Sequence, residues 1–222
     1  MALMRDEHAE PFPNKAAGDS EGLAQLLDGR FAVSFEQTQT IRIYDLNRDG
    51  PFGAAAPGPA LSETQHLPSN QGLEALAVAG DGALIVGAEG GSDNETTLWR
   101  APLNVSTPAP PAARYPLEHG FALTSLDHLP DGGFVALERF YAPVIGARTR
   151  ITMFGEDVFG GGAVAPQELA ALRPPLEIDN FEAVSAVRMP GNITRLYILS
   201  DNNFSERQRT LLYAFDIVGE GG

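Results

Sequence analysis

The chain has 222 residues and a formal net charge of −14, with 29 acidic against 15 basic side chains. This acidic excess disfavours nucleic acid as a partner, because binding to phosphates requires a basic surface. The sequence contains no cysteine, which excludes disulfide bonds and thiolate metal sites. No apolar run reaches the length of a membrane-spanning helix, and residues 1–13 lack the apolar core of an export signal.

Residues 1–18 are polar and contain proline, and we expect them to be a disordered or truncated lead-in to one domain over residues 19–222. Four units of short apolar segments follow. The expected strands are 23–27, 31–36, 40–46 and 61–67; then 73–79, 83–89, 96–102 and 113–117; then 122–129, 133–140 and 148–154; and finally 181–189, 195–201 and 209–217. Residues 166–175 are expected to form one helical turn.

The units repeat about recognisable turns, at Asp28-Gly29, Asp81-Gly82, Asp131-Gly132 and Gly191-Asn192. Asp-Gly between two apolar runs is a strong hairpin signal. Repeats of about 40–50 residues with four strands each are typical of β-propeller blades. We therefore predict an all-β propeller of about four four-stranded antiparallel blades with an open or incomplete ring. A β-sandwich and a solenoid are the alternatives.

Carboxylates fall at the open ends of three of these hairpins. Counting outward equally from each turn centre places Glu74 opposite Glu89, Glu21 opposite Glu36 and Glu182 opposite Asp201. Like charges directly opposite one another destabilise a sheet, so these ends either hold cations or stay hydrated.

In a propeller these strand ends meet at one mouth of the central channel. A site rich in oxygen ligands suits Ca²⁺, which takes roughly six to eight of them. We therefore expect Ca²⁺ as the cofactor, with the six carboxylates as its candidate ligands. Further oxygen donors lie beside the same strand ends, namely Asp19, Asn70, Asp179, Asn180, Asn202 and Asn203. The alternative is structural, with each carboxylate accepting backbone N–H groups from the neighbouring blade.

The third unit departs from this pattern. Counting outward from Asp131-Gly132 places Thr124 opposite Arg139, and the nearest carboxylate, Glu138, lies one residue before Arg139. This offset indicates either a register slip or a bulge. Arg139 would then enter the carboxylate rim, either as a clamp for an anionic substrate group or as a salt-bridge partner of a neighbouring glutamate.

Two further pairs of arginines share one face of a strand, because their positions alternate. They are Arg148 with Arg150, and Arg207 with Arg209. Arg148, Arg150 and Arg209 are candidate substrate ligands beside Arg139, and solvated strand edges are the alternative.

Covalent catalysis finds little support in the sequence. The pattern G-x-S-x-G occurs as GDSEG at residues 18–22, just ahead of an expected strand rather than at the strand-to-helix turn that a nucleophilic serine requires, and there is no H-E-x-x-H motif. Any hydrolysis would therefore depend on a metal ion, with Glu74 or Glu182 as the general base.

Several stretches together resemble the phytase-like β-propeller family, known for the esterase-like activity of phytase. They are GDSEGLA, GRFAVSFE, NQGLEALAV, SLDHLPDGGFVALERFY, GARTRI, DNFEAVSAV and SDNNFSERQRTLLYAFDI, which span residues 18–217. The resemblance implies a propeller that lacks its N-terminal part, a periplasmic or secreted location, and an ester or phosphoester hydrolase acting on a small molecule.

The rival function is a non-enzymatic propeller that binds a ligand or a partner at its carboxylate mouth. An incomplete ring also exposes sheet faces that normally pack against another blade, so we expect self-association.

Overall fold

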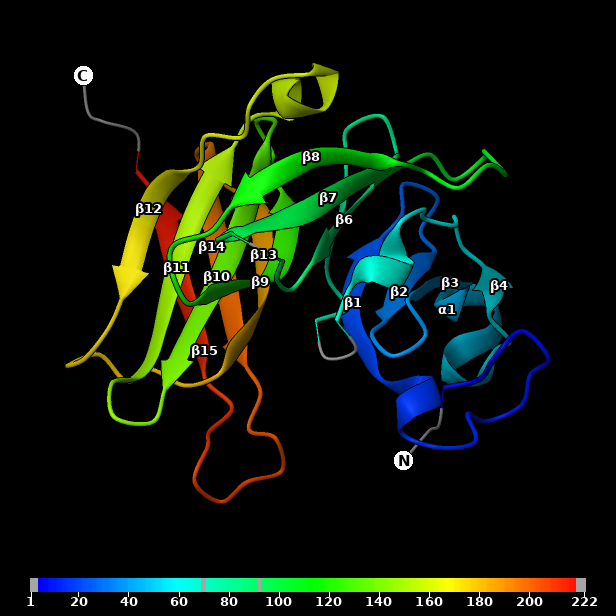
Figure 1. Ribbon diagram of the computed structural model, residues 1–222, viewed down its shortest axis with the longest axis horizontal. Coiled ribbons are helices and arrows are strands. Elements are labelled where there is room, and N and C mark those ends of the chain that lie inside the picture. The colour runs from blue at the N-terminus through cyan, green and yellow to red at the C-terminus, as the bar shows by residue number, and fades with distance from the viewer. Residues whose placement is uncertain (1–3, 69–70, 92, 219–222) are drawn as a thin grey trace.

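The structure is a computed structural model that describes residues 4–68, 71–91 and 93–218, and it is almost entirely β (Figure 1). Four antiparallel sheets follow one another along the chain, and each is built from consecutive strands. This arrangement confirms the predicted β-propeller, and we call the sheets blades 1 to 4. Within the described residues, no helix is long and apolar enough to cross a membrane.

Blade 1 consists of β1 (Ser20–Gln25), β2 (Phe31–Phe35), β3 (Thr40–Tyr44) and β4 (Ala56–Pro57). Blade 2 consists of β5 (Leu73–Val78), β6 (Leu84–Ala88), β7 (Glu95–Ala101) and β8 (Pro111–Pro116). Blade 3 consists of β9 (Phe121–His128), β10 (Phe134–Ala142), β11 (Gly146–Phe154) and β12 (Gln167–Leu172). Blade 4 consists of β13 (Phe181–Met189), β14 (Ile193–Ser200) and β15 (Leu212–Ile217). The helical elements are η1 (Ala16–Gly18), α1 (Leu46–Asp49), η2 (Gly50–Phe52), η3 (Thr64–His66) and η4 (Glu156–Gly160).

The first two strands of every blade are joined by a three-residue loop rather than by the two-residue turn that equal counting assumes. In blade 2, Ala79 donates its N–H to the carbonyl of Ala83, which leaves residues 80–82 in the loop. The last residue of each loop has a positive φ, at 87° in Gly29, 87° in Gly82, 96° in Gly132 and 63° in Asn192. Glycine and asparagine tolerate this left-handed conformation, which explains why they occupy these positions.

The inner strands pack in chain order, with β1 on β5, β5 on β9 and β9 on β13. Each central blade buries both faces because side chains alternate along its strands. In blade 2, Val86 and Trp99 pack towards blade 1, whereas Ile85 and Leu98 pack towards blade 3. β13 and β1 make no comparable contact within the described residues, so the ring is open between blades 4 and 1.

Three predicted elements differ from the structure. The fourth strand of blade 1 is β4 rather than residues 61–67, where η3 lies instead. Residues 166–175 contain the strand β12 rather than a helical turn, because pairing with β11 overrides the helix-forming composition of QELAAL. Blade 4 has three strands among the described residues, not four.

Residues 4–18 precede β1 and lie against the outer face of blade 1. The Phe12 ring packs on Phe35 with centroids 5.2 Å apart, and the Arg42 guanidinium lies over both rings. Tyr44 donates its hydroxyl to the carbonyl of Arg5 at 2.8 Å. These contacts cover part of a sheet face that has no neighbouring blade.

Candidate functional site

The inner strand of every blade contains a β-bulge close to the same end. In blade 2, Leu73 pairs with Ala88 and Ala75 pairs with Gly87, so Glu74 is the extra residue without a cross-strand partner. The corresponding bulges lie at Glu21 in β1, at Thr124 in β9 and at Glu182 in β13. A bulge re-aims a side chain locally. Three of the four bulges therefore present a glutamate.

The sequence predicted that Glu74 lies directly opposite Glu89, Glu21 opposite Glu36, and Glu182 opposite Asp201. The strand pairing shows that this prediction is wrong. The backbone N–H of Glu89 donates to Gly72 at 2.9 Å, and the N–H of Glu36 donates to Asp19 at 3.0 Å. In blade 4 the N–H of Asp201 donates to Asn180 in the same way. The longer loop and the bulge each displace the pairing by one position, so the residue opposite lies two places before the bulged glutamate.

Blade 3 keeps this geometry and changes only the residue types. Arg139 pairs with Ala122, which is again two positions before the bulged residue Thr124. The bulge, rather than a register slip of the whole strand, thus accounts for the irregularity seen in the sequence. Thr124 replaces the glutamate of the other blades, and Arg139 replaces the carboxylate that follows their second strand.

The bulged glutamates lead into a central channel of about 570 Å³, which is lined by residues of all four inner strands. Glu21, Glu74 and Glu182 all contribute to its wall. We call this end of the channel the carboxylate mouth, defined by Glu21, Glu36, Glu74, Glu89, Glu182 and Asp201. These residues come from three blades that are far apart in sequence, and their charges act on one another.

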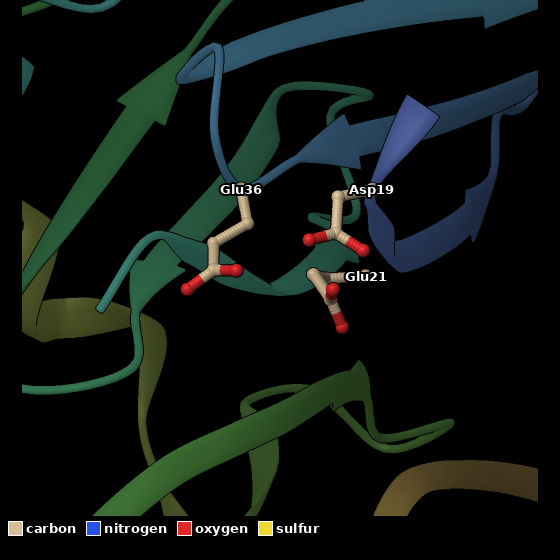
Figure 2. Close-up of side chains that lie close together, drawn as sticks. All are labelled: Asp19, Glu21 and Glu36. Atoms are coloured by element: carbon tan, nitrogen blue, oxygen red, sulfur yellow. The ribbon is translucent and has the colours of Figure 1, made fainter. Parts of the chain in front are cut away.

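Two mouth residues, Glu21 and Glu36, form a close cluster with the neighbouring Asp19 in blade 1. Their carboxylate oxygens lie within 4.8 Å of one another, and Figure 2 shows the three side chains directed into one space. Asp19 directly precedes β1, Glu21 sits in its bulge, and Glu36 follows β2. Three carboxylates at this spacing fit the ligand requirements of a hard divalent cation such as Ca²⁺. The sequence placed Asp19 among the additional donors only.

The crowded charges shift the pKa values of the mouth. Burial, followed by the charges of Glu21, Glu89, Glu36 and Glu182, raises the pKa of Glu74 to about 9. Burial and the charges of Asp19, Glu36 and Glu182 raise the pKa of Glu21 to about 7. Glu74 is therefore protonated at neutral pH when no cation compensates the surrounding charge.

A chain of polar contacts links blades 2, 3 and 4 across the mouth. Arg139 donates from Nη2 to Glu89 at 3.2 Å and from Nη1 to the side-chain oxygen of Asn180 at 2.6 Å. Asn180 in turn donates its amide to Glu182. Burial raises the pKa of both glutamates, and the Arg139 charge opposes that rise. The Nε of Arg139 is buried and has no hydrogen-bond partner among the described residues.

The other arginines predicted from the sequence lie elsewhere. Arg150 sits between blades 2 and 3, where it pairs with Glu138 at 2.8 Å, Glu168 at 2.9 Å and Glu118 at 3.2 Å. Arg148 lies over the ring of Phe140 on the same sheet face. Neither guanidinium is part of the mouth.

Arg209 is tied to the loop that precedes β13. It pairs with Glu177 at 3.1 Å and donates its backbone N–H to Asp179 at 2.8 Å. Asn70, one of the additional oxygen donors, lies outside the described residues.

A second hollow opens beside Arg139 and has a volume of about 570 Å³. Its wall includes Tyr141, Asn180, Arg207 and Gln208. Sequence reasoning did not connect Tyr141 or Gln208 with the site, because they come from β10 and from the loop before β15. Their proximity depends on how blades 3 and 4 pack.

Comparison with known proteins gives one family match. The phytase-like family, described as "Esterase-like activity of phytase", matches residues 1–204. No curated protein matches the chain.

Several solved structures are similar at low identity. The Hadza microbial sialidase Hz136 has 12% identity and a TM-score of 0.48, with 90% of this chain and 46% of that chain covered. A putative glucose dehydrogenase from Thermus thermophilus has 15% identity and a TM-score of 0.46, with 92% and 67% covered. The periplasmic gluconolactonase of Pseudomonas aeruginosa has 16% identity and a TM-score of 0.44, with 90% and 57% covered. The chain thus spans about half to two thirds of these proteins, and we infer nothing about its activity from them.

Proposed function

The chain belongs to the phytase-like family, and on this premise we propose that its carboxylate mouth is the site of a metal-dependent hydrolase of esters or phosphoesters. The observation that carries the proposal is the cluster of Asp19, Glu21 and Glu36, whose oxygens lie within 4.8 Å of one another beside the half-buried glutamates Glu74 and Glu182. An unrelieved cluster of this kind is costly for the folded protein, and a cation would remove that cost.

In this proposal Asp19, Glu21 and Glu36 hold the divalent cation, with Ca²⁺ as the first candidate. When bound, such an ion supplies Lewis acidity to an ester or phosphoryl oxygen and lowers the pKa of a coordinated water. The role of the remaining mouth residues is to move protons and to orient the substrate.

Glu74 and Glu182 have environments that suit opposite proton transfers. Burial raises the pKa of Glu182, which makes it a stronger base, while Arg139 and the amide of Asn180 oppose that rise; Glu182 acts as general base towards the attacking water. Burial is the largest cause of the raised pKa of Glu74 and persists when a cation offsets the neighbouring charges, so Glu74 retains a proton that it donates to the leaving group. Arg139 lies between both carboxylates and the neighbouring hollow, where it can orient an anionic part of the substrate.

The test is hydrolysis of p-nitrophenyl acetate, p-nitrophenyl phosphate and phytate, with chelator and with added Ca²⁺, Mg²⁺ or Mn²⁺. We expect turnover only with a cation. Replacing Glu182→Gln should lower kcat/KM by roughly 100-fold or more, as is usual when a general base is removed. Asp28→Asn is the matched control, because it removes a carboxylate from the opposite end of the same hairpin that carries Glu21 and Glu36.

Turnover that persists with chelator, or that is unchanged in Glu182→Gln, would contradict the hydrolase mechanism. Cation-dependent binding of a substrate analogue without any turnover would instead support the non-enzymatic propeller.

A periplasmic or secreted location is part of the proposal. Extracellular calcium modules bind at about 10⁻⁴–10⁻³ M, a range in which an open carboxylate cluster on the protein surface can be loaded. Fractionation of cells that express the native gene tests this point, and recovery of the protein in the cytoplasm would contradict it.

A further inference from the structure

The outer edge of blade 4 differs from that of the other blades. Blades 1 to 3 each end in a fourth strand, whereas β15 pairs only with β14 within the described part of the chain. An edge strand presents a row of unpaired backbone N–H and C=O groups, which form a template for pairing with another strand. β15 is such an edge over six residues.

The other outer strands carry features that block edge pairing. β4 has only two residues and includes Pro57, and β8 has a proline at both ends. β12 is flanked by Pro166 on one side and by Pro174-Pro175 on the other, which prevent a partner strand from pairing beyond its six residues. β15, with the sequence LYAFDI, has neither proline nor glycine and has a single charge. This composition is typical of strands that associate.

The single charge of β15 is already neutralised. Asp216 accepts two hydrogen bonds from Arg195 on β14, at 2.6 and 2.9 Å. Pairing of two such strands would therefore not bring unpaired like charges together, in spite of the acidic composition of the whole chain. Beside the edge, Leu199 and Leu212 face each other across the strands and are 42% and 64% exposed.

We propose that β15 binds β15 of a second copy of this chain, so that the two edges pair antiparallel about a two-fold axis. An antiparallel edge is self-complementary, because each strand offers to the other the same pattern of donors and acceptors. Leu212 and Ala214 then gain apolar neighbours from the partner strand. Stacking of blade 4 on blade 1 of another copy is disfavoured, because residues 4–18 cover part of that face of blade 1. The assembly is a closed dimer rather than a filament.

The test compares two identical substitutions by light scattering on size-exclusion chromatography at low to high micromolar concentration. Ala214→Lys places a lysine on the exposed face of the free edge strand, and lysine is a common block to edge pairing. Ala112→Lys places one at another exposed position, on β8, and serves as the control. We expect dimers for the wild type and for Ala112→Lys, and monomers at all concentrations for Ala214→Lys, with circular dichroism confirming that both variants fold.

Hydrogen exchange on the wild type gives a second readout that needs no variant. The amides of β15 should exchange more slowly as the protein concentration rises, while those of β8 should not change. A wild type that stays monomeric, a dimer that survives Ala214→Lys, open-ended oligomers, or β15 protection that is independent of concentration would each overturn the proposal. A monomer whose β15 becomes protected only by an added peptide would assign the edge to a different partner.

Discussion

Burial and the neighbouring carboxylates of the mouth strongly raise the pKa of Glu74, and this shift makes the free energy of unfolding depend on pH. Its pKa is 4.5 ordinarily and about 9 in the folded protein, so the folded state keeps a proton that the unfolded chain releases. The free energy of unfolding should therefore fall as pH rises from about 4.5 to about 9 in the absence of a cation.

Glu74→Gln removes this loss because glutamine cannot ionise. At pH 8 in chelator we expect the variant to be more stable than the wild type by about 1–3 kcal/mol, allowing for screening by water in the mouth. At pH 4 the two should be equal. Urea denaturation at both values measures the difference. A wild type as stable as the variant at pH 8 would show that the mouth does not hold Glu74 protonated.

Asp28→Asn provides the contrast for this experiment. The side chain and backbone of Arg30 lower the pKa of the exposed Asp28, so its favourable contribution is present at high pH and is lost as pH falls. This variant should show no gain in stability at pH 8.

The element that aims the glutamates is the bulged inner strand, and Gly22 shows why its sequence matters. A Cβ at this position would lie 2.6 Å from the Glu74 carbonyl oxygen and 2.8 Å from Oγ of Ser34. The Gly22 N–H also donates to that hydroxyl at 2.8 Å. Glycine thus lets β1 approach β5 closely at the mouth.

Gly22→Ala should destabilise the protein by about 1–3 kcal/mol, the usual cost of overpacking. The control is Gly160→Ala, since no atom lies within 4 Å of the Cβ that this substitution adds. We expect the control to stay within about 0.5 kcal/mol of the wild type. Chemical denaturation measures both, and equal stability of the two variants would mean that the close approach of β1 to β5 is unimportant.

At this scale the sequence reveals the hairpins but not their register. Asp-Gly between apolar runs identified the turns, and the repeat identified the blades. Counting outward from the turn centre misplaced the pairing of the strand ends by two positions. One position comes from the third residue of the loop and the other from the bulge, and neither is evident from the pattern of apolar residues. Arg139 and Arg150 are both candidate substrate ligands from the sequence, and only the strand pairing within blade 3 shows that Arg150 lies against Glu138 and Glu168.

Across the whole molecule, the propeller brings together carboxylates that belong to separate hairpins. Asp19, Glu21 and Glu36 come from blade 1, and the channel adds Glu74 from blade 2 and Glu182 from blade 4 (Figure 2 shows the first three). No single blade could assemble this concentration of negative charge. A divalent cation would offset it, and any ligand that binds only the folded state stabilises that state.

The most direct measurement is calorimetric titration of the chelator-treated protein with Ca²⁺, Mg²⁺ and Mn²⁺. We predict saturable binding of at least one of these ions by the wild type and by Asp28→Asn, with a rise in the melting temperature. Binding should be lost when Asp19→Asn and Glu36→Gln are combined. No binding of any of the three ions by the wild type, or unchanged binding in the combined variant, would contradict a metal centre at the mouth.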